Sequence, residues 1–241
     1  SHTPLILNSE GKKLSKRDCV TSIDEFREMG YLPEALSNYM AFLGWSPKSA
    51  DREILSLEEI SEIFDLSEIN KAGAKFSWEK LNWINSQYIK NMESIKLIEI
   101  MRKYWDDNGW EPPSQEWANK LAILIRDSMT LLKDSIDQSK PFFLIPTIQK
   151  EGQDFLENKD SKLSLKLILN YLIEQNTIKL NKEKAKEIIN EISKKHNIKK
   201  GILMKSLRVA FFGSLSGPDL IQSWELFAES KTDRTRIERC L

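Results

Sequence analysis

The helical period of the apolar residues is the feature that most limits what this chain can fold into. In residues 33–43 the apolar side chains recur three and four positions apart, which places them on one face of an α-helix. Pro33 stands in the first turn of this segment and Gly44 follows its end, as helix start and stop signals do. A strand-like pattern is confined to the first few residues. The sequence therefore predicts a mainly α protein.

The same signals predict a series of helices joined by short polar loops. Residues 23–29 end at Gly30, and a capping box that begins at Ser56 predicts a helix through Phe64. Another helix is predicted to begin near Ser77, with its apolar residues facing inward. Later helices are predicted over residues 95–104, 116–132, 152–157, 163–175, 182–196 and 202–212.

Breaks in this pattern divide the chain into three consecutive parts. The first covers residues 1–95, the second covers residues 96–153, and the third covers residues 154–241. The second part ends near the proline-containing stretch 141–146. We therefore expect consecutive small helical bundles. Periodicity and composition by themselves predict no function.

The charge balance and the cysteines exclude several classes of protein. Lys+Arg and Asp+Glu both number 36, so a general attraction to nucleic acid or membrane is absent and any polyanion binding must be local. Cys19 and Cys240 stand far apart without a Cys/His cluster, which argues against a metal site and a disulfide framework and favours a reducing, cytoplasmic compartment. No apolar run approaches the ~20 residues of a membrane span.

A short basic segment near the start of the chain is the first candidate for chemistry. It reads EGKKLSKRD from Glu10 to Asp18 and surrounds one hydroxyl, that of Ser15, with Lys12, Lys13, Lys16 and Arg17. Lysines act as point charges toward phosphate oxygens, and Gly11 supplies backbone freedom. Such a segment suits a phosphate clamp, although a solvated surface loop explains the same composition.

Three blocks of sequence, in order, decide between these alternatives. The segment PLILNSEGKKLSKRD with MGYLPEALSNYMAFLGWSP, the segment FSWEKLNWINSQYI and the segment GILMKSLRVAFFGSLSGPDL resemble bacterial-type glutamyl-tRNA synthetases of class I. KLSKR is similar to that family's second signature, KMSKS. Ser77, the pair Lys205-Ser206 and the pair Phe211-Phe212 depart from the family pattern.

The resemblance implies an ATP-dependent reaction in the intact enzyme, with magnesium on the phosphates. It assigns ATP binding to Lys13, Ser15, Lys16 and Arg17, and it gives Lys16 the catalytic task of stabilising charge on the ATP phosphates. The family's first signature, HxGH, belongs to an N-terminal Rossmann-like half, and neither His2 nor His196 stands in such a setting. We therefore expect a C-terminal part that binds no cofactor and activates no amino acid by itself.

For the rest of the chain the resemblance implies a stem-contact region and an α-helical-cage anticodon-binding domain. Contacts to tRNA need cations for phosphates and planar groups for unstacked bases. The candidates in the stem-contact region are Lys75, Lys80 and Lys90. The candidates in the anticodon-binding domain are Arg126, Lys205, Arg208, Arg234 and Arg236. A solvated or ion-paired surface cation is the alternative for several of these residues, whereas Trp78 and Trp83 are expected in the core.

The implied partner is tRNA(Glu), and tRNA(Gln) stays open as a second substrate. We expect a monomer that does not bind membranes. A helical protein-interaction scaffold without RNA specificity is the alternative function, because the tryptophans and the zero net charge suit it as well.

Overall fold

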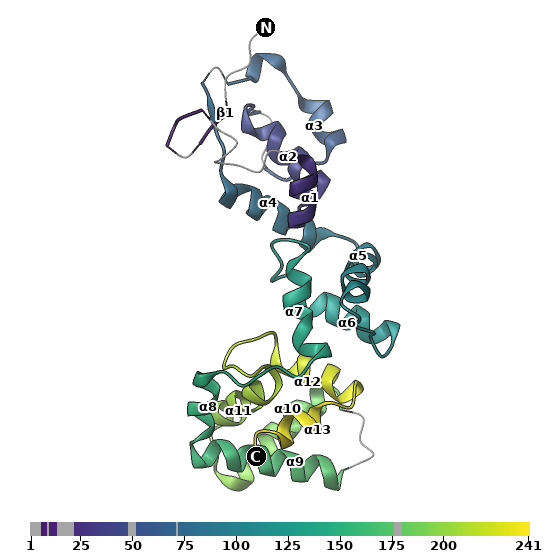
Figure 1. Cartoon of the computed structure of the whole chain (residues 1–241), viewed down its shortest axis with the longest axis vertical. Helices are drawn as coiled ribbons and strands as arrows, with labels where there is room; N and C mark the ends of the chain where they lie inside the picture. Colours follow the sequence, from purple (N-terminus) through teal and green to yellow (C-terminus); the bar gives the residue numbers. More distant parts are fainter. Residues whose placement is uncertain (1–5, 9, 14–21, 48–51, 71, 176–179) are drawn as a thin grey trace. The chain divides into compact units, whose positions relative to one another are not determined.

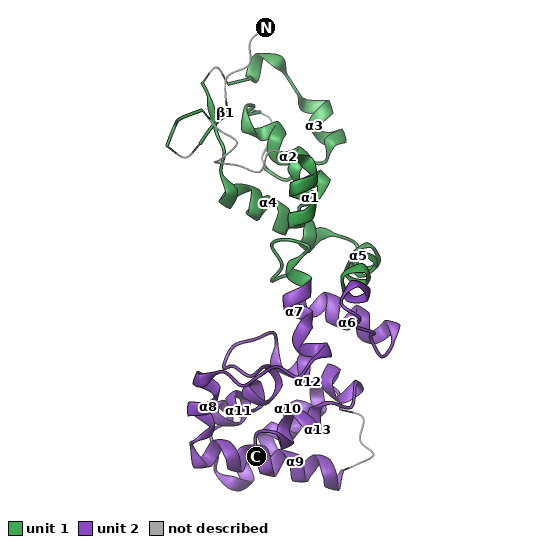
Figure 2. Cartoon of the chain, in the orientation of Figure 1, with its two compact units in different colours: residues 1–104, 126–135 green, residues 105–125, 136–241 purple. Residues whose placement is uncertain are grey.

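The computed structural model describes residues 6–8, 10–13, 22–47, 52–70, 72–175 and 180–241, and these are mainly helical, as predicted (Figure 1). The chain forms two compact units (Figure 2). Unit 1 contains residues 1–104 and 126–135, and unit 2 contains residues 105–125 and 136–241. The three-part division read from the sequence stays a prediction. None of the described helices is long and apolar enough to cross a membrane.

Unit 1 combines helices with a minimal sheet. Strands β1 and β2 are parallel, and Ile6 pairs with Ala74. The strand-like start of the chain is thus confirmed at β1, whereas β2 is not visible in the sequence pattern. The elements are β1 (Ile6–Leu7), α1 (Ile23–Met29), α2 (Pro33–Leu43), α3 (Leu57–Ile63), the 3-10 helix η1 (Leu66–Glu68), β2 (Ala74–Lys75), α4 (Trp78–Asn91) and most of α5 (Ser94–Asp107).

Two short helices of unit 1 begin at capping boxes. The backbone N–H of Glu59 donates to Ser56 Oγ at 3.2 Å, and the Ser56 N–H donates to the Glu59 carboxylate at 2.8 Å. Ser22 and Glu25 form the same reciprocal pair at the start of α1. The capping box predicted for α3 is therefore confirmed, and these exchanges satisfy backbone donors that helices this short would otherwise leave unpaired.

A buried amide connects α4 to two other segments of unit 1. The Asn85 side chain, which is fully buried, accepts a hydrogen bond from the Leu32 N–H at 2.9 Å and donates to the Thr130 carbonyl at 2.6 Å. Removing this amide would leave a buried backbone donor and a backbone acceptor without partners. Asn85 therefore fixes the start of α2 and the turn at residue 130 against α4.

The two tryptophans of α4 have different environments. Trp78 is half-buried and packs against Phe26 and Phe76, with ring centroids 5.8 and 5.0 Å away. Trp83 is 42% exposed, so its expected core position is wrong. The core face of α4 is formed by Leu81 and Ile84, and residue 83 falls outside that face.

Unit 2 is a helical array built around buried aromatic rings. The Phe227 ring lies 5.0 Å from Phe142, which is stacked on it, and 4.9 Å from Phe211. The Trp117 indole donates to the Leu226 carbonyl at 2.9 Å. The elements that follow α5 in the chain are α6 (Gln115–Arg126), α7 (Asp134–Phe143), α8 (Lys150–Leu156), α9 (Lys159–Glu174), α10 (Lys182–His196), α11 (Lys200–Phe212), α12 (Leu220–Glu229) and α13 (Asp233–Glu238).

The helix predicted over residues 116–132 is too long. It ends at Arg126, and a turn follows in which the Asp134 carboxylate accepts from the N–H groups of Thr130 and Leu131, both at 2.8 Å. Pro141 lies inside α7, which ends two residues later at Phe143, and the next helix begins at Lys150, so the part boundary expected near residues 141–146 stays a prediction. In contrast, α10 has the predicted bounds of residues 182–196.

Candidate nucleic-acid interface

The basic segment near the start of the chain is described only in part. Ser15, Lys16 and Arg17 lie outside the described residues, so the catalytic assignment to Lys16 stays a prediction. Before them, the Asn8 side chain accepts from the N–H groups of Glu10 and Lys12, at 3.1 and 2.9 Å. These bonds form a tight turn from which an exposed Lys13 continues the chain.

Lys75 and Lys80 both line one cavity of about 400 Å³ in unit 1. Tyr39, Trp45, Arg52 and Glu53 also line it, so its wall combines aromatic rings with charges that are mostly positive. The structure thus brings together two of the three predicted stem-contact lysines. Lys90, near the other end of α4, is half-buried and does not line this cavity.

The lysines that line this cavity differ in whether they form ion pairs. Lys80 forms an ion pair with Glu53, and its Nζ lies 4.5 Å from the centre of the Trp83 ring. Lys75 is exposed and carries no ion pair among the described residues. The indole N–H of Trp45 is buried and has no hydrogen-bond partner in the described part of the chain. The cavity therefore offers the Lys75 cation to an incoming acceptor, whereas the Trp45 N–H is enclosed within the protein.

Three of the predicted arginines of the anticodon-binding domain contact the protein itself. Arg126 is half-buried, with Nε 3.8 Å from the Asp127 carboxylate. Arg208 donates to the carbonyls of Gly217 and Pro218 at 2.7 and 3.0 Å and so holds the segment after α11. Arg234 donates to the Leu172 carbonyl at 2.6 Å. Lys205, by comparison, is exposed, with its Nζ 6.0 Å from the centre of the Phe155 ring.

Arg236 has a role inside the protein. Its side chain is fully buried and donates to Thr232 Oγ1 at 3.2 Å, to the Phe211 carbonyl at 3.0 Å and to the Leu144 carbonyl at 3.3 Å. The guanidinium carbon also lies 4.2 Å from the centre of the Phe227 ring. Burial lowers the pKa of Arg236 to about 10, and the positive charge of Arg239 adds to this effect. An RNA phosphate cannot reach this group in the folded unit.

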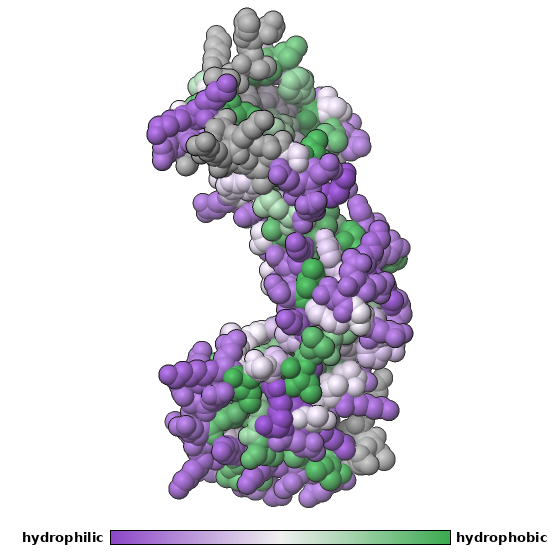
Figure 3. Space-filling view, viewed as in Figure 1, coloured by the Kyte–Doolittle hydropathy of each residue, from purple (hydrophilic) through white to green (hydrophobic). Residues whose placement is uncertain are grey.

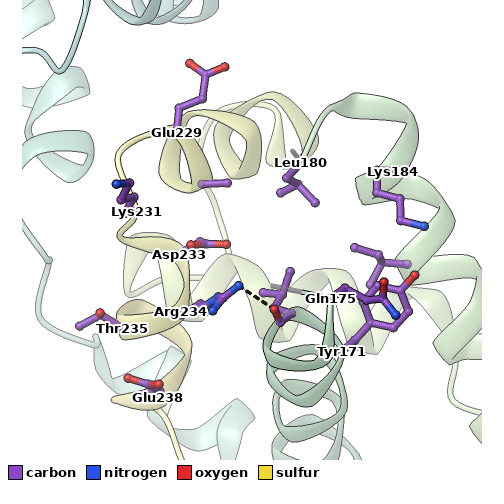
Figure 4. Close-up of a pocket in the computed structure, with 13 residues that line it drawn as sticks. Tyr171, Gln175, Leu180, Lys184, Glu229, Lys231, Asp233, Arg234, Thr235 and Glu238 are labelled. Carbon is purple, nitrogen blue, oxygen red and sulfur yellow. Dashed lines mark hydrogen bonds between the residues drawn. The ribbon is translucent and has the colours of Figure 1, made fainter. Parts of the chain in front are cut away.

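A second cavity, of about 560 Å³, lies in unit 2 between α9, α10 and the α12–α13 turn (Figure 4). Lys184 and Tyr171 lie on one side of it, and Asp233 and Arg234 on the other (Figure 4). Burial raises the pKa of the Asp233 carboxyl, and hydrogen bonds to backbone N–H groups offset only part of that effect. The cavity has charges of both signs on its wall, so it is not a simple anion site.

Lys120 forms an ion-pair cluster that no local sequence pattern predicts. Its Nζ lies 3.2 Å from the Glu116 carboxylate, 3.1 Å from that of Glu225 and 2.5 Å from that of Glu229. Burial acts to lower the pKa of Lys120, but the hydrogen bonds to Glu229, Glu225 and Glu116 outweigh it and raise that pKa above its ordinary value. This cation is therefore committed to the fold of unit 2.

Known proteins resemble the whole chain. A family model described as the catalytic domain of class I tRNA synthetases (E and Q) matches residues 1–83. A second model, described as an anticodon binding domain, matches residues 96–241. A glutamate–tRNA ligase of Prochlorococcus marinus strain AS9601 is 97% identical over 241 residues, covering 100% of this chain and 51% of that relative. The chain belongs to the glutamyl-tRNA synthetase family.

More distant members of this family agree with the assignment. The glutamate–tRNA ligase of P. marinus strain NATL2A is 50% identical over 241 residues, again 51% of its own length. The crystal structure of a glutamate tRNA ligase from Elizabethkingia meningosepticum in complex with its amino acid matches with a TM-score of 0.90 and 31% identity. That match covers 100% of this chain and 50% of the other. The chain therefore spans about half the length of the relatives it matches.

Two of the three departures from the synthetase family pattern have local physical explanations. Ser77, where the family has Asp, caps α4 by accepting from the Lys80 N–H at 3.2 Å, and both residue types serve well in that position. Phe211 and Phe212, where the family has Leu-Thr, are both buried against the Phe227 ring. The predicted α-helical anticodon-binding domain is thus retained with an aromatic core.

Sequence reasoning missed the residues whose environment depends on distant segments. Tyr171 and Lys184 meet at the second cavity, with the lysine Nζ 5.6 Å from the ring centre. Several lysines occur in residues 179–186, and no local signal in the sequence distinguishes Lys184 from its neighbours. Its contact with a residue of the preceding helix appears only in the folded unit.

Proposed function

We propose that this chain is the tRNA-binding part of a glutamate–tRNA ligase and that its partner is tRNA(Glu). The observation that carries the proposal is the match of residues 96–241 to an anticodon binding domain, within a chain that resembles glutamate–tRNA ligases over its full length. A role in translation also favours a cytoplasmic protein, and we propose that it acts as a monomer.

In the intact enzyme the reaction would join glutamate to tRNA in two steps. Glutamate and ATP give glutamyl-adenylate and pyrophosphate, and the glutamyl group then passes to a hydroxyl of the terminal adenosine of the tRNA with release of AMP. Lys13, Ser15, Lys16 and Arg17 would meet the ATP phosphates, where positive groups stabilise the charge that develops in the transition state. Among the described residues, no group of three or more His, Cys, Asp and Glu side chains is placed to hold a metal ion.

We propose that this chain by itself binds tRNA and does not aminoacylate it. The KLSKR segment matches one of the two signatures that meet at the family's ATP site, and the chain contains no HxGH sequence. Exchange of pyrophosphate into ATP, driven by glutamate, should therefore be absent when this chain is assayed alone.

The exposure and the partners of the predicted cations favour some of them over others as RNA contacts. Lys75 and Lys80 share a cavity, Lys90 and Arg126 are half-buried, and Lys205 is exposed. These five are the proposed phosphate contacts. Arg208 and Arg234 donate to backbone carbonyls and could reach RNA only with their other N–H groups, and Arg236 is left out because it is fully buried.

The test is a comparison of tRNA affinities over a range of salt concentrations. We expect the chain to bind tRNA(Glu) more tightly than an unrelated tRNA, with log affinity falling by roughly 0.7–0.9 per log unit of salt for each phosphate contact. The same titration with tRNA(Gln) decides whether that tRNA is a second partner. Equal affinity for all three, without a salt slope, would contradict the proposal and favour the protein-interaction scaffold.

A further inference from the structure

The turn between α10 and α11 carries a dense group of exposed cations. Lys194, Lys195, Lys199 and Lys200 are all exposed, and together they form what we call the α10–α11 basic turn. From residue 192 to residue 218 the sequence contains no Asp or Glu, which is the longest such stretch in a chain whose net charge is zero. The local charge at this turn is therefore strongly positive although the chain as a whole is neutral.

The backbone of the basic turn is well defined. Asn197 adopts the left-handed conformation with φ of +54° and ends α10, and the Ile198 side chain is buried. Ser193 Oγ donates to the Ile198 carbonyl at 2.7 Å, and the Ile198 N–H donates to the Ser193 carbonyl at 3.2 Å. One buried residue thus anchors the turn between two pairs of lysines, which are held near each other.

The four lysines are not used to stabilise the fold by ion pairs. Within the described parts of the chain, none of them forms an ion pair, whereas Lys120 contacts three glutamates. Arg208 and Arg236, also in unit 2, are bound to backbone carbonyls. Much of the surface of unit 2 seen in Figure 3 is hydrophilic. Glu191, three residues before Lys194, is the nearest carboxylate to the basic turn in the sequence, and the next one after it is Asp219.

The helix dipole accounts for only two of the four lysines in the basic turn. Lys194 and Lys195 lie in the last turn of α10, where the negative end of the helix dipole favours cations. Lys199 and Lys200 lie at the first positions of α11, where the positive end disfavours them, and no acidic residue in that first turn compensates. The positive charge of these two lysines therefore lowers the stability of the folded chain. The presence of both lysines is explained if an anionic partner binds at this position.

We propose that the α10–α11 basic turn binds the phosphodiester backbone of tRNA, an inference that rests on the proposed function. Lysine ammonium groups are suited to backbone phosphates because they act as point charges without reading bases. A membrane surface fits less well, since interfacial binding also needs exposed apolar residues and the apolar residue of the turn, Ile198, is buried. The basic turn thus positions RNA and does not select its sequence.

The experiment compares two variants of the full chain that carry the same change in charge. The first is K194Q/K195Q/K199Q/K200Q, in the basic turn. The matched control is K150Q/K159Q/K162Q/K166Q, which removes four exposed lysines of α8 and α9. Two of these lysines also stand at helix starts, and none forms an ion pair within the described residues. Affinity for tRNA(Glu) and for an unrelated tRNA is measured from low to high salt for both variants and for the unsubstituted chain.

We expect the basic-turn variant to lose about tenfold or more in affinity for both tRNAs at low salt. We also expect its salt slope to become shallower by about 2.8–3.6, which is about 0.7–0.9 for each of the four lost phosphate contacts. The control variant should keep the slope of the unsubstituted chain. The thermal midpoint of the basic-turn variant should be equal or higher, because unfavourable charge leaves the start of α11. A lower midpoint would indicate a structural role, and K199Q/K200Q would then repeat the test with two substitutions.

The outcomes separate this inference from the proposed function. If the unsubstituted chain binds tRNA with a salt slope and the basic-turn variants bind identically, the inference is wrong while the proposed function stands. If the unsubstituted chain shows no salt-dependent binding to tRNA, both are wrong. Binding to vesicles of phosphatidylserine and phosphatidylcholine that depends on the four lysines, with tRNA binding unaffected, would assign the turn to a membrane surface instead.

Discussion

Replacing Arg236 by methionine should strongly destabilise unit 2. Methionine fills much of the same space but donates no hydrogen bonds, so the carbonyls of Phe211 and Leu144 would lose their donors inside the core. Each unsatisfied buried carbonyl costs about 1–3 kcal/mol. The lost contact between the guanidinium and the Phe227 ring adds about 2 kcal/mol for a desolvated pair.

Opposing this loss, the variant no longer buries a charge that has no carboxylate partner. The desolvation of such a charge costs several kcal/mol in the native protein, and methionine removes that cost. The balance predicts a net loss of about 2–4 kcal/mol in the free energy of unfolding for Arg236→Met. Arg236→Lys keeps the charge but cannot reproduce three hydrogen bonds, and it should lose about 1–2 kcal/mol.

The assay is urea unfolding followed by circular dichroism, with Arg27→Met as the control. Arg27 forms only an exposed ion pair with Asp24 at 3.0 Å, so its replacement should change the free energy of unfolding by less than about 0.5 kcal/mol. If Arg236→Met is as stable as the unsubstituted chain, or more stable, the desolvation cost outweighs the three hydrogen bonds. The structural role argued for Arg236 would then be wrong.

Three further substitutions test other contacts of unit 2. Lys120→Met should lower the free energy of unfolding by about 1–2 kcal/mol, because two poorly exposed glutamates of α12 lose their cation. The loss should be larger at low salt than at high salt, and urea midpoints at both salt concentrations measure it. Asp233→Asn should raise the urea midpoint at pH 7, because its raised pKa means that the charged form is less favourable in the folded chain than in the unfolded one. Gly213→Ala should cost about 3 kcal/mol or more, since φ is +71° and a Cβ would lie 2.2 Å from the Thr147 carbonyl oxygen; thermal unfolding measures it.

Each of these has a result that would contradict it. For Lys120, a loss that is independent of salt would exclude an electrostatic origin. For Asp233, the stability cost of burying the charged carboxylate is present above the folded pKa and disappears below the ordinary value of 3.8. The stability advantage of the asparagine variant must therefore shrink as the pH falls toward that value. An advantage that grows at acidic pH would overturn the assignment. For Gly213, an unchanged midpoint would mean that the turn after α11 relaxes freely.

The sequence predicted helix boundaries correctly where they depend on residues close together in the chain. The capping residue Ser56, the stop at Gly30 and the bounds of α10 were all visible as short-range patterns, and the structure confirms them. The end of α6 was missed because Asp134 makes its turn from beyond the apolar segment. Pro141 lies inside α7, but the helix ends only two residues later at Phe143, as the helix-breaking effect of proline leads one to expect.

The sequence predicted the protein family of the candidate site, but it did not predict the environment of the individual site residues. The three sequence blocks indicated the synthetase family, because each block places distinctive residue types at fixed spacing. The burial of Arg236 was not predictable, since its acceptors at Phe211 and Leu144 are distant in the sequence and an arginine with neutral partners leaves no charge pattern. The same holds for Lys75 and Lys80, which share a cavity with residues of α2 that precede them by more than thirty positions.

The most direct test of the account is whether the chain reads the anticodon. Affinity is measured for tRNA(Glu) and for the same tRNA with its anticodon bases exchanged, at one salt concentration. If residues 96–241 act as an anticodon-binding domain, the exchanged tRNA should bind about tenfold or more weakly, since the loss of stacking and hydrogen bonds to unstacked bases costs about 1–3 kcal/mol per base. Equal affinity for the two tRNAs would contradict the central claim.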